Sequence, residues 1–184
     1  MRRIVMSLAA ALAIGCAPAE EAENLAPGCD ARAAQAWNAT PEAALSVEAV
    51  SFGPDCDRGV ATLVIRDSSG APLYADTHFT GHVMTLAGAT DQATMQAALM
   101  EWLNSSNATM ATTSALPEWP ENAEGPVSGE FPFYPEEGVD RAAYLSLRQQ
   151  DAPLFCYVQG MESQKCVAFV DDGVASVGVQ TFPG

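Results

Sequence analysis

Basic residues are scarce in this sequence. Its 184 residues include 8 Lys and Arg against 23 Asp and Glu, which gives a formal net charge of −15 at pH 7. Lys165 is the only lysine. A surface of this sign repels nucleic-acid phosphates and anionic lipid headgroups, so we predict no nucleic-acid partner. It attracts basic proteins or divalent cations, although solubility alone is the plainer explanation of the charge.

Motifs that signal catalysis or metal binding are also missing. The sequence has no G-x-S-x-G nucleophile elbow, no Gly-rich phosphate loop and no C-x-x-C pair. The only histidines, His78 and His82, have a spacing that suits a metal site on a helix. We expect them at the end of a strand, where residues four apart lie about 13 Å from each other. We therefore predict no catalytic residue, no metal site and no cofactor.

The apolar stretch near the N-terminus is too short to cross a membrane. Residues 4–15 form an uncharged run of 12 residues, preceded by Arg2 and Arg3. As a helix this run would span about 18 Å, whereas the bilayer core is about 30 Å thick. A basic end, a short apolar run and a small-residue exit are typical of a secretory signal. One interpretation is an ordinary secreted protein, cut near residues 17–19.

The residues that end this run are more specific. Leu12, Ala13, Ile14 and Gly15 precede Cys16, and this stretch resembles the lipobox of bacterial lipoprotein precursors. The resemblance implies that residues 1–15 are a signal peptide, that cleavage occurs before Cys16, and that Cys16 carries a lipid anchor. It also implies a place in the cell envelope. Ala17 after the cysteine is similar to precursors sent to the outer membrane, facing the periplasm. A soluble periplasmic or secreted protein is the alternative.

Four cysteines remain once Cys16 is set aside: Cys29, Cys56, Cys156 and Cys166. An exported chain meets an oxidising compartment, where disulfides form. A hairpin centred on Met161 would place Cys156 directly opposite Cys166, at the separation that a disulfide requires. We therefore predict a Cys156–Cys166 bond, and a Cys29–Cys56 bond by elimination and closeness in sequence. The second bond would close a ring of 28 residues and contribute about 3 kcal/mol.

The rest of the chain predicts a flexible tether over residues 16–28 and one α+β domain over residues 29–184. Hydrophobic periodicity and turn residues predict strands at 47–52, 60–66, 73–79, 154–158, 166–170 and 174–179, and helices at 91–104 and 140–149. An Ala-rich stretch at 30–38 favours one or two further helical turns, and Asp172-Gly173 predicts a two-residue hairpin turn. We expect two small antiparallel meanders or hairpins, each with one packed helix.

Residues 116–138 combine five prolines and six acids with four aromatic residues. Proline at this density excludes long regular elements, but a plain linker would not hold so many aromatic rings. We predict an ordered, irregular loop across the core, with residues 131–134 docked and residues 121–128 mobile. The aromatic residues form a possible binding surface: Trp119, Phe131, Phe133 and Tyr134.

Together these features favour a non-enzymatic structural or interaction module of the bacterial envelope. Its expected partners are the membrane, through Cys16, and a basic envelope protein. One alternative is an acidic binder or inhibitor of a cationic envelope protein. A second is a periplasmic hydrolase whose site the sequence does not reveal.

Overall fold

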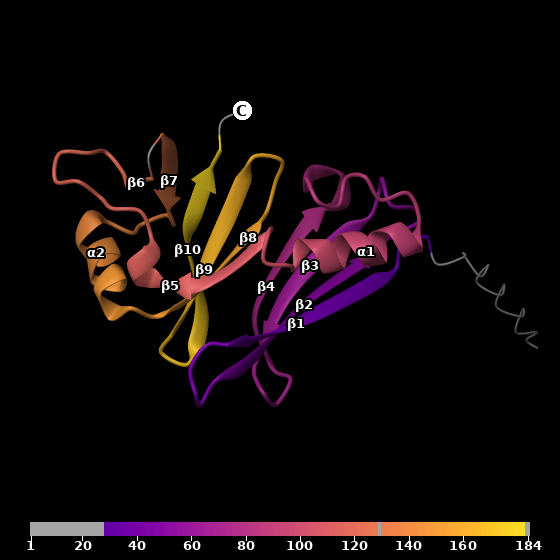
Figure 1. Ribbon diagram of the computed structural model, residues 1–184, viewed down its shortest axis with the longest axis horizontal. Helices are drawn as coiled ribbons and strands as arrows, with labels where there is room; N and C mark the ends of the chain where they lie inside the picture. Colours follow the sequence, from indigo (N-terminus) through magenta and orange to yellow (C-terminus); the bar gives the residue numbers. More distant parts are fainter. Residues whose placement is uncertain (1–27, 129, 183–184) are drawn as a thin grey trace, which may run out of the picture.

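A computed structural model describes residues 28–128 and 130–182 of the chain. The predicted signal peptide, Cys16 and all but the last residue of the tether lie outside the described residues. Strands make up 44% of the structure and helices 18%, arranged as two antiparallel sheets (Figure 1). Within the described residues, no helix has the length and hydropathy needed to cross a membrane.

The first sheet is a four-stranded meander in the order β1-β2-β3-β4. Its strands are β1 (Ala31–Asn38), β2 (Ala44–Phe52), β3 (Val60–Arg66) and β4 (Pro72–Phe79). The three predicted strands in this region are confirmed. The helical turns predicted over residues 30–38 are wrong, because this stretch is β1. Pairing with β2 and the burial of Ala33 and Trp37 on alternate positions outweigh the helix propensity of alanine.

The second sheet has six strands in the order β5-β8-β9-β10-β7-β6. They are β5 (Ala108–Thr112), β6 (Val127–Ser128), β7 (Phe131–Pro135), β8 (Pro153–Val158), β9 (Ser163–Val170) and β10 (Gly173–Thr181). The three predicted C-terminal strands are confirmed. The turn between β9 and β10 lies one residue earlier than predicted, at Asp171 and Asp172. Both have positive φ, 50° and 59°, as this hairpin turn requires.

Two α-helices and two 3₁₀ turns complete the described part of the fold. Helix α1 (Gln92–Trp102) begins after Asp91, whose side chain accepts a hydrogen bond from the Thr94 amide at 2.8 Å. Helix α2 (Arg141–Gln150) begins after Asp140. The 3₁₀ turns are η1 (Thr80–His82) and η2 (Thr113–Ala115). Helix α1 packs against β1, and α2 packs against η2. Both predicted α-helices are confirmed.

The predicted α+β class is wrong, since the chain forms two sheets of four and six strands with only two α-helices in the described residues. Hydrophobic periodicity did not predict the strands that are short or that carry proline. Residues 105–138, where the sequence predicted no strand, supply β5, β6 and β7. Strand β7 carries Pro132 and Pro135 and pairs over only a few residues with each neighbour, so it has no regular strand signal.

The six-stranded sheet lies between two apolar clusters. Odd-numbered residues of β8 and β9 (Phe155, Tyr157 and Val167) face the four-stranded sheet and α1. Even-numbered residues on the same strands (Leu154 and Ala168) pack with Tyr144 of α2 and Phe133 of β7. Because side chains alternate between the two faces of a strand, one sheet contributes residues to both apolar clusters.

Candidate functional site

Both predicted disulfides are present. Cys156 and Cys166 are directly opposed in the β8–β9 pair, with Cα atoms 4.0 Å apart. Cys29 and Cys56 have Cα atoms 5.0 Å apart and join the start of the described chain to the loop after β2. Because all four are bonded, none offers a free thiol for nucleophilic chemistry.

The aromatic residues of the 116–138 segment have different surroundings. Phe133 is 2% exposed and packs on Tyr144, with ring centroids 5.9 Å apart. Trp119 also packs on Tyr144 and donates a hydrogen bond from its indole to the Ala123 carbonyl at 3.0 Å. Phe131 contacts Phe182.

Only Tyr134 of the four is largely exposed, at 58%. It borders an apolar depression of about 540 Å³ that Val127, Pro132 and Phe133 also line. Val127 and Ser128 belong to β6, where the sequence predicted irregular chain. The segment thus presents one exposed ring beside a shallow hollow.

A polar cluster lies on the inner face of β4, where the two sheets meet. Tyr74, Asp76 and His78 alternate along the strand opposite the buried residues of β3. The Asp76 Oδ2 atom accepts hydrogen bonds from the Tyr157 hydroxyl at 2.8 Å and from the Lys165 Nζ atom at 3.1 Å. Tyr157 and Lys165 are opposed on β8 and β9. One carboxylate therefore links the four-stranded sheet to the six-stranded sheet.

The cluster holds Asp76 and Lys165 in their charged forms. Burial acts to raise the pKa of Asp76, but hydrogen bonds from Tyr157 and Lys165 and the nearby positive charge outweigh it, so the pKa lies below its ordinary value. Burial acts to lower the pKa of Lys165, and the bond to Asp76 reverses this, so the net shift is upward. Burial is also the main cause of the raised pKa of Tyr157.

His78 lies at the margin of this cluster. Its Nε2 atom is 3.5 Å from Asp76 Oδ2 and has no hydrogen-bond partner, and its ring meets Trp102 edge-on at 5.9 Å. Burial lowers the pKa of His78, although the Asp76 charge opposes the shift, so the imidazole is neutral at pH 7.

His82 lies apart from this cluster, in η1 and beside the Phe79 ring. In the part of the chain that the structure describes, no three His, Cys, Asp or Glu side chains are arranged to hold a metal ion.

Sequence reasoning singled out His78 and Lys165 as rare residues but did not bring them together. The useful signal was the alternation of Tyr74, Asp76 and His78, since three polar residues at every second position share one face of a strand. The pattern does not say which face is buried. Nor does it place Lys165, which lies 89 residues from Asp76.

A groove of about 410 Å³ lies where β1 approaches β5. It is lined by Ala36, Trp37, Asn38, Ala39, Met110, Ala111, Thr112 and Pro153. Each of these two strands is the last in its sheet, so each has one side without a neighbouring strand. Within residues 28–128 and 130–182, no strand pairs with these two outer sides.

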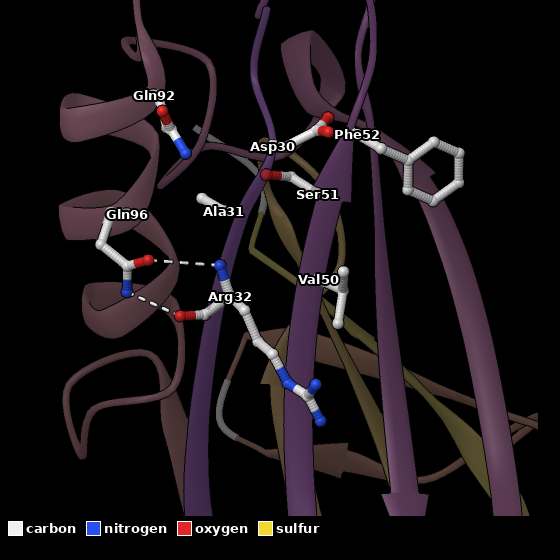
Figure 2. A pocket seen from close by; sticks show the side chains of 8 residues that line it. All are labelled: Asp30, Ala31, Arg32, Val50, Ser51, Phe52, Gln92 and Gln96. Atoms are coloured by element: carbon white, nitrogen blue, oxygen red, sulfur yellow. Dashed lines mark hydrogen bonds between the residues drawn. The ribbon is translucent and has the colours of Figure 1, made fainter. Parts of the chain in front are cut away.

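The free side of β1 can be identified from a neighbouring contact. Figure 2 shows the Gln96 side chain of α1 bonded to both backbone groups of Arg32: its Oε1 accepts from the Arg32 amide at 3.2 Å, and its Nε2 donates to the Arg32 carbonyl at 2.6 Å. The backbone of Arg32 therefore points away from β2. Because backbone direction alternates along a strand, the amide and carbonyl of Ala36 point the same way, into the groove.

The free side of β5 follows from the same reasoning. The Asn107 carbonyl accepts from Val158 and the Thr113 amide donates to Ala152, so odd-numbered residues of this stretch face β8. The amides and carbonyls of Met110 and Thr112 consequently face away from β8. The groove is bordered by exposed hydrogen-bonding backbone on both sides.

No protein-family model, curated protein or solved structure matches this chain. Its possible function must therefore be inferred from the cluster at the sheet junction and the groove between the two edges. In the cluster the polar groups bond mainly to one another, whereas in the groove the hydrogen-bonding backbone faces outward. The groove is the stronger candidate for binding another molecule.

Proposed function

We propose that the protein is a lipid-anchored interaction module of the bacterial envelope that binds an extended segment of a basic partner in the β1–β5 groove. The observation that carries this proposal is the pair of open strand edges bordering one groove. Open edges are templates for strand addition, in which a peptide pairs with the backbone of a sheet.

The recognition chemistry is mixed. Alternate backbone amides and carbonyls at Ala36 or Met110 supply hydrogen bonds that any extended segment can satisfy. Apolar contact comes from the exposed side chains of Ala36 and Met110 and from Pro153. We expect the bound segment to alternate, with apolar side chains facing the groove and polar ones facing solvent.

The negative charge of the chain favours a positively charged partner. The whole chain has 15 more acidic than basic groups, and Asp151 lies near the groove, hydrogen-bonded to Ser114 at 2.5 Å. Ser114 in turn bonds to Thr112 of the groove wall. Acidic groups attract lysine and arginine side chains over several ångströms and accelerate their association at low salt.

The anchor is a separate part of the proposal and has its own test. Its support is the lipobox-like sequence that ends at Cys16. We expect Cys16→Ser to leave the protein unprocessed or to release it from the membrane fraction. Mass spectrometry that finds an unmodified mature N-terminus beyond Cys16 would contradict the anchor and leave the groove untouched.

The groove can be tested with a labelled peptide of alternating lysine and valine, with binding measured by fluorescence anisotropy. Met110→Pro removes an outward amide without disturbing a bond to β8, since an edge strand tolerates proline. We expect this variant to bind the peptide about 10-fold more weakly, because one or two backbone hydrogen bonds are lost. Met110→Ala, which keeps the amide, is the matched control for the lost side chain.

Two further peptides sharpen the result. A peptide N-methylated at every residue has no backbone N–H group left to pair with a strand, and a glutamate–valine peptide carries the wrong charge. We expect both to bind poorly. Equal binding of the N-methylated peptide would disprove strand addition in this groove, and an unchanged affinity for Met110→Pro would exclude pairing with β5.

A further inference from the structure

A row of apolar side chains crosses the outer face of the four-stranded sheet at one end. Phe52, Val60 and Phe79 are register partners on three adjacent strands. Phe52 is 52% exposed and Phe79 is 62% exposed. Several large apolar side chains exposed along one row are uncommon on a protein surface without a partner.

The row continues onto the end of the second sheet. After η1, the Met84 amide donates a hydrogen bond to the Gly160 carbonyl at 3.3 Å, and Met161 follows in the β8–β9 turn. The Phe182 amide donates to the Glu162 carbonyl at 2.8 Å, beside the same turn. In Figure 1 this turn and the C-terminal end of β10 lie together at the top. We call this band the apolar rim: Phe52, Val60, Phe79, Met84, Met161 and Phe182.

The chain reaches the domain at this same end. Gly28 lies against the loop that follows Phe52, where a Cβ atom on Gly28 would be only 2.0 Å from the Pro54 carbonyl oxygen. Eleven residues, 17–27, separate it from Cys16. Eleven residues reach at most about 40 Å when extended, and a flexible chain of this length averages about 18 Å. An anchor at Cys16 would therefore hold this end of the domain nearest the membrane.

We propose that the apolar rim rests on the lipid surface and contacts zwitterionic lipid. The proposal depends on the anchor at Cys16 but not on the groove. Acidic residues lie beside the rim: Asp30 lines the same pocket as Phe52, the Asp57 backbone lies near Gly81, and Glu162 follows Met161. Their charge disfavours anionic headgroups, whereas aromatic and methionine side chains enter an uncharged interface by burying apolar area.

This orientation leaves the groove accessible. Residue Ala31 of β1 pairs with Ser51, beside the rim, and Ala36 lies five residues further along the strand. At about 3.3 Å per residue the groove begins roughly 17 Å from the rim. A domain resting on its apolar rim would thus present the β1–β5 groove away from the lipid, toward partners in the compartment.

Vesicle flotation tests the contact without the anchor. A chain that begins at Ala17 keeps every described residue and both disulfides. We expect it to float with phosphatidylcholine vesicles, weakly but measurably. Phe52→Ser with Phe79→Ser should reduce the partition coefficient about 10-fold, since membrane binding scales with buried apolar area. Replacing half the lipid with phosphatidylglycerol should also reduce it.

Met100→Ser is the matched control, because Met100 is as exposed as Phe79 but lies on α1. We expect this variant to float like the unmodified chain. Equal flotation of the double Phe variant would overturn the proposal, as would no flotation of the unmodified chain. Circular dichroism of each variant checks that the sheets remain folded. A failed anchor test at Cys16 would remove the orienting tether even if flotation were observed.

Discussion

The two sheets differ in how they are covered, and the difference separates structural from surface roles. The six-stranded sheet has an apolar cluster on each face. The four-stranded sheet is buried on one face only. Its other face carries an exposed ion-pair network, in which Glu48 bonds to Arg32 at 2.7 Å and to Arg66 at 3.0 Å. A sheet with two buried faces holds the fold together, and one with an open face can supply contacts to other molecules.

The sheets also meet in an unusual way at β4. This edge strand turns Asp76 inward, where apolar side chains would be expected, and the carboxylate binds groups from the second sheet. An inward charge on an edge strand discourages pairing with further strands. The junction is thus polar at its margin and apolar at its centre, and these two parts should respond differently to mutation.

The largest effect is expected at the apolar centre. Phe155 is fully buried and packs between Trp37 and Tyr157. Phe155→Ala should lower the free energy of unfolding by about 3–5 kcal/mol, because it leaves a cavity between the sheets. Val64→Ala on the open face of the first sheet should cost less than about 1 kcal/mol. Urea denaturation measures both, and equal losses would contradict the division between the sheets.

The disulfides should have the next largest effect. Cys29→Ser with Cys56→Ser opens the longer ring and should cost about 3 kcal/mol by the loop-entropy estimate. Cys156→Ser with Cys166→Ser opens a ring across a hairpin that register already holds, and should cost about 2–3 kcal/mol. Thermal unfolding of the two double variants ranks them. A much larger loss of stability for the Cys156/Cys166 double variant would show that this disulfide contributes more than the loss of chain entropy.

The stability that the polar margin contributes should depend on pH. Asp76 has a pKa below its ordinary 3.8, so its stabilising effect is present above that value and is lost as the pH falls through the lower, folded value. His78 has a pKa below its ordinary 6.5, so the unfolded chain binds a proton first and stability falls as the pH drops below about 6.5. Both effects reduce stability in acid.

Between pH 7 and pH 5 the decrease should come mainly from His78, so His78→Gln should flatten the dependence of the urea midpoint on pH. Asp76→Asn should cost about 1–3 kcal/mol at pH 7, because Lys165 then lacks its anionic partner. If the His78→Gln variant keeps the full slope, another group is responsible.

The smallest effects on stability are expected at the 116–138 segment, where the buried ring of Phe133 is next to the exposed ring of Tyr134. A protease of broad specificity should cut near Glu124 and spare residues 131–134, because β7 pairs with β10. Tyr134→Ala should leave the unfolding free energy within about 0.5 kcal/mol of the original. Rapid cleavage throughout the segment would show that β7 does not hold it.

Sequence reasoning worked where local signals and tertiary packing agree. The Cys156–Cys166 bond was predictable because two β-rich runs flank a short loop with both cysteines five residues from its centre. The helix predicted at 91–104 agrees with α1 for the same reason, since Asp91 caps it and its buried residues Met95, Leu99 and Trp102 share one face. By contrast, β1 has an Ala-rich sequence whose inward Ala33 and Trp37 follow a period of two that a helix propensity conceals.

The missed features depend on contacts between distant residues. Strand β7 exists because β10 offers it a partner, and nothing near Pro132 in the sequence indicates this. The cluster around Asp76 joins β4 to β8 and β9, and the groove joins β1 to β5. Such contacts are set by the way two sheets pack, which hydrophobic periodicity does not encode. The anchor at Cys16 stays a prediction.

The bond from Gln96 to Arg32 has a consequence for self-association. A side-chain amide offers the same donor and acceptor as a peptide group, and here it takes the place of the first residue of an added strand. A second copy that stacked on β1 would have to begin beyond this point, leaving only a short length of edge to pair with. Fibril growth requires long, continuous pairing. Gln96 therefore limits the pairing of further copies along the β1 edge and so disfavours fibril growth. The remaining length of this edge can still bind a short extended segment reversibly.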